Sequence, residues 1–335
     1  MAEGERQAGE ALPDGRPTGG AQAPGAGERS GAGDQAQQPE PHEGQHSAEQ
    51  RLAGRRDEPM VGAAAIAEAL AAGGELHATE IAPGTPDAIE FRDVYKAFGS
   101  NRVLRGLNMS LPEGHISMII GPSGTGKSVC IKHIVGLLYP DAGDVLVQGI
   151  SVPSLPDDEL FAMRRRFGVL FQDGALFGSL NLFDNVAFPL RQHTEKGEDE
   201  IEQIVNRRLR EVGLGGEGHK MPNELSGGMR KRAGFARALV LEPQIVLFDE
   251  PDSGIDPVRT ALLCELIKEV HAENGGTYVV ITHDILSARR IASYLVLLWQ
   301  GKVVEQGPAG ELFESEHPFT SQFLSGNPRG PLTMD

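Results

Sequence analysis

A glycine-rich segment near the middle of the chain has the residue types and spacing that surround phosphate groups. It fits the pattern G-x-x-x-x-G-K-[S/T] and consists of Gly121, Pro122, Ser123, Gly124, Thr125, Gly126, Lys127 and Ser128, followed by Val129. Glycines let backbone N–H groups face the phosphates, and the start of a helix adds partial positive charge. We predict that these residues bind a nucleotide, that Lys127 reaches the terminal phosphates and that the Ser128 hydroxyl binds Mg²⁺.

An acidic pair follows a short apolar run further along the chain. Asp249 and Glu250 come directly after residues 245–248, which read as a buried strand. Taken alone, such a pair is more often a solvated turn. With a phosphate loop in the same sheet, it predicts that Asp249 helps to hold Mg²⁺ and that Glu250 acts as the general base on water. The predicted chemistry is hydrolysis of a nucleoside triphosphate.

The elements that must position these residues alternate between strand and helix patterns. Strands are predicted at residues 89–94, 115–121, 143–149, 167–171, 245–248 and 277–281, with a hairpin at 294–299 and 302–306. Helices are predicted at residues 127–138 (ended by Pro140), 195–212 and 258–273. This order predicts an α/β fold with a mainly parallel sheet and helices on both faces. Because no internal repeat is visible, the chain carries one nucleotide-site half.

Composition separates the first 87 residues from the remaining 248. Residues 1–87 hold 6 basic and 15 acidic groups, and the first aromatic residue of the chain is Phe91. We therefore expect a disordered acidic tail there, with a transient helix at residues 61–72. The net charge of −16 argues against nucleic-acid binding. Two cysteines fit a reducing, cytosolic setting, and Cys130 is expected to be a small core residue. No signal peptide or membrane-spanning run is visible.

Further motifs resemble those of ABC-transporter ATPases. Residues 225–228, Leu-Ser-Gly-Gly, resemble the signature motif of that family, and Ser226 lies 23 residues before Asp249. Gln172 resembles the Q-loop glutamine, and Asp256 the D-loop aspartate. His283 resembles the switch histidine. The resemblance covers roughly residues 88–315 and implies a P-loop NTPase (RecA-like) core with an antiparallel β-subdomain and a helical subdomain at about 173–235. Residues 316–335 then form a C-terminal extension.

The resemblance also implies roles for these residues. The catalytic set would be Glu250, His283 and Gln172, and the Mg²⁺ ligands would be Ser128, Gln172 and Asp249. Phe98 occupies the position that stacks on adenine, although Tyr95, three residues earlier, is a rival. The signature residues Ser226, Gly227 and Gly228 would contact ATP held by a second copy, in a head-to-tail homodimer with two-fold symmetry.

A narrower resemblance is to the ATPases of Mce/Mla-type lipid transport. It rests on residues 171–177, 226–233 and 249–254, and the C-terminal sequence at 323–331 is similar to the actinobacterial Mkl/MceG branch. The long acidic N-terminal segment departs from that pattern. The resemblance implies ATP-driven transport of lipid or sterol at the cytoplasmic face of the cell membrane, as a peripheral subunit. The partners would be a Mla/YrbE-type integral permease and Mce lipid-binding subunits. Leu176, Phe177 and Phe183 either belong to the core or, where exposed, mark a partner surface.

Other functions stay open at this point. An ABC importer ATPase for another small solute fits the same motifs, because the substrate is chosen by other subunits. A soluble, non-transport ABC ATPase is less favoured, since 122 residues between Lys127 and Asp249 leave no room for long coiled coils. A regulatory protein that uses ATP only as a switch would not need Glu250 and His283. The basic runs 164–166 and 230–232 read as short exposed helical stretches.

Overall fold

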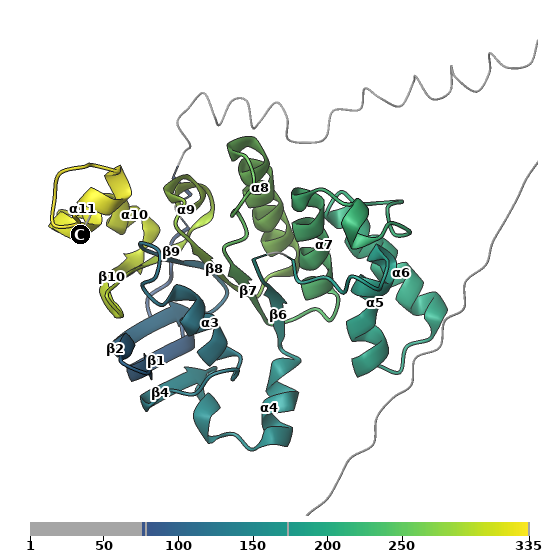
Figure 1. Ribbon diagram of the computed structural model, residues 1–335, viewed down its shortest axis with the longest axis horizontal. Coiled ribbons are helices and arrows are strands. Elements are labelled where there is room, and N and C mark those ends of the chain that lie inside the picture. The colour runs from purple at the N-terminus through teal and green to yellow at the C-terminus, as the bar shows by residue number, and fades with distance from the viewer. Residues whose placement is uncertain (1–75, 78, 173, 334–335) are drawn as a thin grey trace, which may run out of the picture. The chain divides into compact units, whose positions relative to one another are not determined.

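A six-stranded sheet forms the centre of the computed structural model, which describes residues 76–77, 79–172 and 174–333 (Figure 1). Its strand order is β10-β9-β3-β8-β7-β6. The bounds are Lys302–Pro308 (β10), Tyr294–Trp299 (β9), Ile116–Ile120 (β3), Thr277–Thr282 (β8), Ile245–Asp249 (β7) and Phe167–Leu170 (β6). All neighbours are parallel except β10, which pairs antiparallel with β9.

The central strands are buried on both faces, because helices or a second sheet cover each side. Every residue of β3 and β8 is buried. Alternate side chains enter different cores: Tyr278 and Val280 point to one, whereas Val279 and Ile281 point to the other. This is the near-continuous apolar pattern expected of a parallel sheet between two layers.

A smaller antiparallel sheet packs on one side of this centre. Its order is β2-β1-β4-β5, with bounds Asn101–Pro112 (β2), Asp87–Phe98 (β1), Ala142–Val147 (β4) and Ile150–Ser151 (β5). Helix α3 (Lys127–Ile134) contributes to the same core. The nearby α4 (Asp157–Arg164) follows a 3-10 turn at Val152–Ser154.

The other face carries a group of helices. Helices α5 (Leu182–His193), α6 (Glu198–Glu211) and α7 (Gly227–Leu239) contact one another, and a 3-10 turn at Pro222–Glu224 precedes α7. The rest are α8 (Pro257–Asn274), α9 (Ile285–Ile291), α10 (Ala309–Phe313) and α11 (Pro318–Ser325). In Figure 1 the α5–α7 group lies to the right of the sheet and β1, β2 and β4 lie to its lower left. The predicted fold class, with antiparallel and helical subdomains, is confirmed.

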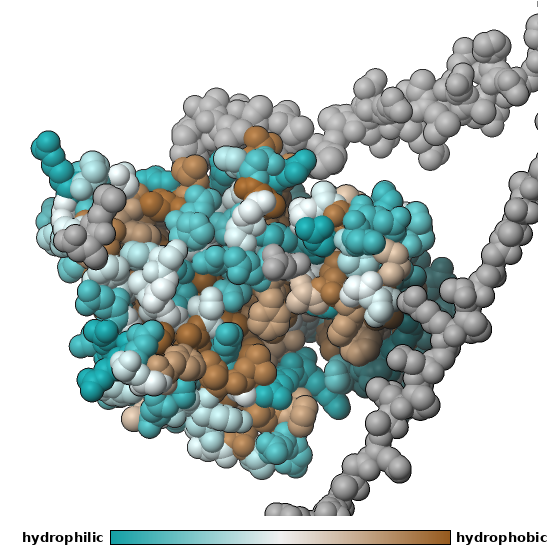
Figure 2. All heavy atoms as spheres, in the orientation of Figure 1, coloured by the Kyte–Doolittle hydropathy of each residue, from teal (hydrophilic) through white to brown (hydrophobic). Residues whose placement is uncertain are grey.

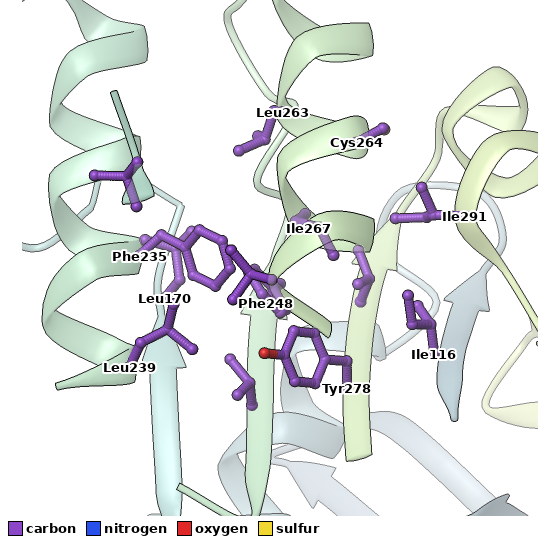
Figure 3. Close-up of a cluster of buried hydrophobic side chains, with 14 of the residues drawn as sticks. Ile116, Leu170, Phe235, Leu239, Phe248, Leu263, Cys264, Ile267, Tyr278 and Ile291 are labelled. Atoms are coloured by element: carbon purple, nitrogen blue, oxygen red, sulfur yellow. The ribbon is translucent and has the colours of Figure 1, made fainter. Parts of the chain in front are cut away.

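Three buried aromatic residues hold α7 against the central sheet (Figure 3). Phe235 of α7 lies edge-on to Phe248 of β7, with ring centroids 5.1 Å apart. Tyr278 of β8 lies 5.8 Å beyond Phe248. Because Phe248 immediately precedes Asp249, this packing fixes the acidic strand end relative to the helix that begins at the signature motif.

Helices α5, α9, α10 and α11 were not predicted, and two other departures from the predicted elements have a clear physical reason. The helix predicted at 127–138 ends at Ile134, because Gly136 has a left-handed φ of +66°. Glycine suits this position, since a Cβ there would approach Leu160 to 2.7 Å. Strand β2 was not predicted. Its pairing with β1 shifts register at several points, and Gly106 has a φ of +75°, so the alternation of apolar and polar residues is masked. The hairpin of β9 and β10 is confirmed.

Most of the predicted acidic tail, including residues 61–72, lies outside the described residues. Just before β1, the backbone N–H of His77 donates to the carbonyl of Arg289 at 3.0 Å. Within the residues that the structure describes, no helix combines the length and hydrophobicity needed to cross a membrane.

Candidate nucleotide-binding site

The glycine-rich segment forms the connection between β3 and α3. Gly121 has a φ of +148°, and a Cβ there would collide with the carbonyl oxygen of Leu298. Gly126 is the N-cap of α3 with a φ of +102°. Glycine is therefore required where the chain leaves the sheet and where it enters the helix. The resulting loop places backbone N–H groups at a helix N-terminus, which suits an anion.

The side chain of Lys127 lies inside this loop. Only 4% of the residue is exposed, and its Nζ donates to the carbonyls of Gly121 at 2.8 Å and Pro122 at 2.9 Å. Burial lowers the pKa of Lys127, while the carboxylates of Glu250 and Asp249 oppose that shift. The ammonium group is thus held at the mouth of the phosphate loop, facing the acidic pair.

The structure brings Ser128 and Asp249 together, although 121 positions separate them. The Ser128 hydroxyl donates to Oδ1 of Asp249 at 2.7 Å. Burial raises the pKa of Asp249, and Glu250 raises it further. A hydroxyl and a carboxylate are oxygen ligands that Mg²⁺ prefers, and a cation there would relieve the cost of burying the carboxylate. These residues therefore fit the predicted metal.

Glu250 and His283 lie side by side at the same edge of the sheet. His283 Nδ1 is 3.7 Å from Oε1 of Glu250, and the backbone N–H of Glu250 donates to the carbonyl of Ile281 at 2.9 Å. Glu250 has a φ of +49°, a left-handed conformation that costs a non-glycine residue about 1–3 kcal/mol. Such strain persists only where surrounding contacts impose it. Here it turns the carboxylate away from the strand axis and toward His283.

The two remaining predicted groups near this edge are less enclosed. Gln172 lies two residues beyond β6, is exposed, and makes no side-chain hydrogen bond among the described residues. Phe98 ends β1 with 47% of its surface exposed, and Lys96 Nζ lies 5.8 Å from its ring centroid. Tyr95 lies within the strand, where its hydroxyl packs over Gly106. Tyr95 is 49% exposed, so exposure does not distinguish the two rings for stacking.

The signature residues form the start of α7. Ser226 is the N-cap and its hydroxyl accepts from the backbone N–H of Met229 at 3.3 Å. A Cβ on Gly227 would meet nothing nearer than 3.9 Å, and one on Gly228 nothing nearer than 4.0 Å. Packing within the chain therefore does not require these glycines. They leave the positive end of a 13-residue helix open to a close approach from outside.

Asp256 is the N-cap of α8. Its Oδ1 accepts from the backbone N–H groups of Val258 at 3.1 Å and Arg259 at 3.0 Å. The hydrogen bond from Arg259 is the main reason that the pKa of this carboxyl is lowered. Asp256 thus shapes the loop between β7 and α8, and no contact among the described residues brings it to the phosphate loop.

Sequence reasoning missed several residues that join α7 to the site. Arg237 donates to the carbonyls of Ala175 at 2.9 Å and Gly174 at 3.1 Å, directly after the Q-loop. The prediction that 230–232 is an exposed stretch was wrong for Lys231, which is 5% exposed and donates to Ser253. One signal pointed to Lys231: it lies four positions before buried Phe235 and therefore on the same face of α7.

Cys130 and the side chains that could bind a metal ion have the following surroundings. Cys130 is fully buried in α3, as predicted, and burial raises the pKa of its thiol to about 12. Among the described residues, no group of three or more His, Cys, Asp or Glu side chains has the arrangement of a metal site. The Ser128–Asp249 pair would be a different kind of site, because phosphate oxygens of a bound nucleotide would supply its other ligands.

Comparison with known proteins identifies the class. The family described as ABC transporter matches residues 104–253. The probable ribonucleotide transport ATP-binding protein mkl of Mycobacterium leprae is 50% identical over 74% of this chain and 71% of its own. The intermembrane phospholipid transport system ATP-binding protein MlaF of Escherichia coli is 40% identical over 73% of this chain and 91% of its own.

A solved structure also resembles this chain. The dimeric, post-hydrolysis structure of an ATP-binding cassette bound to ADP and Pi has a TM-score of 0.61 and 31% identity, covering 66% of this chain and 98% of that one. The fold and sequence define an ATP-binding cassette protein. The chain belongs to the ABC transporter family and is an ATP-hydrolysing ATPase of that family.

Replacing Lys127 tests the site directly. Lys127→Ala removes a charge-assisted hydrogen-bond donor worth about 1.5–3 kcal/mol, so the Kd for ATP should rise about 10- to 100-fold. Titration with a fluorescent ATP analogue measures it. Lys268→Ala is the control, because Lys268 lies on α8 and pairs only with Glu265 at 3.7 Å among the contacts seen. An unchanged Kd for Lys127→Ala would contradict the assignment of the loop.

Proposed function

We propose that two copies of this chain bind two Mg²⁺·ATP head-to-tail and hydrolyse them with the residues gathered at the edge of the sheet. The observation that carries this proposal is the Ser128–Asp249 hydrogen bond, which joins the phosphate loop to the strand that ends in Glu250. The dimeric form and bound ADP and Pi of the similar cassette support it. In this proposal residues 88–315 are the ATPase domain, 173–235 its helical subdomain, and 1–87 and 316–335 are extensions.

Each residue has a physical task in this mechanism. The backbone of residues 121–129 surrounds the phosphates, Lys127 contacts the terminal ones and Phe98 stacks on adenine. Ser128, Asp249 and Gln172 would hold Mg²⁺, which would supply neutralisation of the phosphate charge. Glu250 accepts a proton from the attacking water, which Gln172 helps to place. His283 lies close enough to Glu250 to orient it and to contact the γ-phosphate.

The second copy completes the site. Ser226, Gly227 and Gly228 present the positive end of α7, and they lie on a different element from the phosphate loop of the same chain. Facing the partner's γ-phosphate would give this open helix end a charged ligand. Asp256, at the start of α8, would lie near the same boundary. ATP then favours the closed pair because only closure brings both halves to it.

We propose further that the transported substrate is a lipid. Support comes from MlaF, whose name describes phospholipid transport, and from the similarity of residues 171–177 and 226–233 to Mce/Mla-type ATPases. In this proposal the chain lies peripherally at the cytoplasmic face of the membrane, bound to a Mla/YrbE-type permease and Mce subunits. Ribonucleotide transport is the second candidate, because the 50% identical relative carries that description.

A surface on the helical group is suited to the permease. Phe177 and Phe188 are 43% and 39% exposed, and their ring centroids lie 4.9 Å apart. Asn185 holds the intervening loop by accepting from the backbone N–H of Phe177 and donating to three carbonyls. Figure 2 shows hydrophobic side chains at the surface over α5 and beside β6.

This surface differs in part from the predicted one. Leu176 and Phe183 are partly buried against the core, so Phe188 takes their place beside Phe177. A rigidly held pair of exposed aromatic rings is typical of a protein-binding surface.

Removal of the proposed base should separate binding from hydrolysis. Glu250→Gln keeps the shape but loses the proton acceptor, so kcat should fall about 10²- to 10⁴-fold while ATP stays bound and the two copies stay together. Phosphate release and size-exclusion chromatography with ATP measure the two effects. Glu269→Gln is the control, since Glu269 is an exposed residue of α8. Hydrolysis at the wild-type rate by Glu250→Gln would contradict the assignment.

The substrate proposal is tested with the same variant. Tagged Glu250→Gln is isolated from gently solubilised membranes with ATP, and its partners and bound small molecules are identified by mass spectrometry. We expect a multi-span permease, Mce-type subunits and lipid. A permease with a solute-binding protein would transfer the proposal to a small solute, and co-purified nucleotides in the permease would favour ribonucleotide. A chain that stays free of membrane proteins would contradict transport.

A further inference from the structure

Asp252 lies two residues after Glu250, in the loop that leaves β7. One of its carboxylate oxygens, Oδ2, accepts a hydrogen bond from the hydroxyl of Thr282, the last residue of β8. The other, Oδ1, is buried with no hydrogen-bond partner among the residues that the structure describes. Burying a carboxylate oxygen without a hydrogen-bond partner costs free energy, so the presence of Asp252 at this position requires an explanation.

The hydroxyl of Thr282 continues this connection. It accepts from the backbone N–H of Asp284 at 2.9 Å, while it donates to Asp252. His283 stands between these two residues in the sequence. The side chain of Asp252 is therefore linked, through one hydroxyl, to the backbone on both sides of His283.

The backbone supplies a second link between the same two loops. The N–H of Glu250 donates to the carbonyl of Ile281 at 2.9 Å, and the N–H of Ser253 donates to the carbonyl of Glu250 at 3.1 Å. The first of these bonds holds the two strand ends together, and the second closes the turn that contains Asp252. Among the described residues, the Asp252–Thr282 contact is a side-chain hydrogen bond that joins this turn to the residue before His283.

Apolar side chains pack around one side of Asp252. It lines a cavity of about 10 Å³ with residues of α8, β8 and α9, among them Leu263, Cys264, Ile267 and Ile291. Figure 3 shows these four side chains, three along α8 and Ile291 across from them. Oδ1 of Asp252 is out of contact with solvent, and the cavity beside it has room for about one water molecule, so little solvent reaches this side of the carboxyl.

We infer that Asp252 is a positioning residue for hydrolysis, which sets the separation of Glu250 and His283 through its hydrogen bond with Thr282. This inference rests on the proposed roles of Glu250 and His283. Their side chains lie 3.7 Å apart, and the side chain of His283 is 54% exposed whereas that of Glu250 is 22% exposed, so packing constrains His283 less than Glu250. The hydrogen bond between Asp252 and Thr282 holds the backbone beside His283 and supplies a further constraint.

The charges around Asp252 are consistent with this role. Burial raises the pKa of its carboxyl, and Asp284 raises it further, while His283 and the hydrogen bond from Thr282 act in the opposite direction. An amide in place of the carboxyl keeps an oxygen that accepts from Thr282 and removes the buried charge. The conservative variant should therefore keep the function that the truncated one loses.

The test compares matched pairs of variants by steady-state hydrolysis of ATP. Asp252→Ala and Thr282→Val each remove one partner, and both should lower kcat about tenfold or more, because a misplaced catalytic group is costly. The KM for ATP should stay within about twofold, since the phosphate loop is untouched. Asp252→Asn and Thr282→Ser keep the hydrogen bond and should restore most of kcat. The double variant Asp252→Ala/Thr282→Val should lose no more than either single one.

Two controls separate positioning from stability and from the proposed base. Ile291→Val removes one methyl from the same cavity and should lower the melting temperature slightly without changing kcat. Thr282→Val keeps the side-chain shape, so it decides the outcome if Asp252→Ala fails to fold. If Glu250→Gln is inactive but both truncated variants keep wild-type kcat, this inference alone is overturned. If Glu250→Gln hydrolyses ATP normally, the proposed function fails instead.

Discussion

The site depends on one constraint: the parallel strands β3, β8 and β7 end at nearly the same level at one edge of the sheet. In the register of the sheet, Ile120 of β3 pairs with Thr282 of β8, and Ile281 of β8 pairs with Asp249 of β7. The phosphate loop, the histidine segment and the acidic pair therefore leave the sheet at nearly the same height. Only this alignment allows Ser128 to donate to Asp249 across the intervening strand. A slip of one residue would turn every side chain of a strand to the other face and break the contact.

The two hydrophobic cores hold that alignment under strain. Glu250 and several glycines of the phosphate loop adopt left-handed backbone conformations, and Asp249 and Lys127 are charged groups in partly buried places. None of these features stabilises the folded chain when ATP and a cation are not bound. The fully buried strands β3 and β8 and the aromatic contact of Phe235 with Phe248 offset them. A site built for ATP and a cation is thus kept ready by packing behind it.

Much of this arrangement was predictable from the sequence, and the exceptions have physical reasons. Lys127 to Ser128 and Asp249 to Glu250 follow apolar strands, so chain order alone placed them at one edge. Strand β2 was not predictable, because its bulges hide the period of two. The roles of Lys231 and Asp252 were also hidden, since each depends on a partner 22 or 30 positions away that only the folded chain brings near.

The signature residues show a different limit of prediction from the sequence. Residues 225–228 were recognised by resemblance, and the structure adds that Gly227 and Gly228 have open space around them within the chain. An intrachain reason for glycine is therefore lacking in the described part of the molecule. In the proposed head-to-tail pair, the approach of a second copy explains these glycines, so the proposed function depends on the composite site.

Mixing two defective variants tests that claim most directly. Lys127→Ala damages the phosphate loop and Gly228→Asp damages the signature, so each pure variant should be inactive. In a head-to-tail pair of one copy of each, both defects fall in one site and the other site is intact. An equal mixture should recover ATP hydrolysis, up to about one quarter of the wild-type rate per chain. A mixture no more active than either variant alone would contradict the composite site.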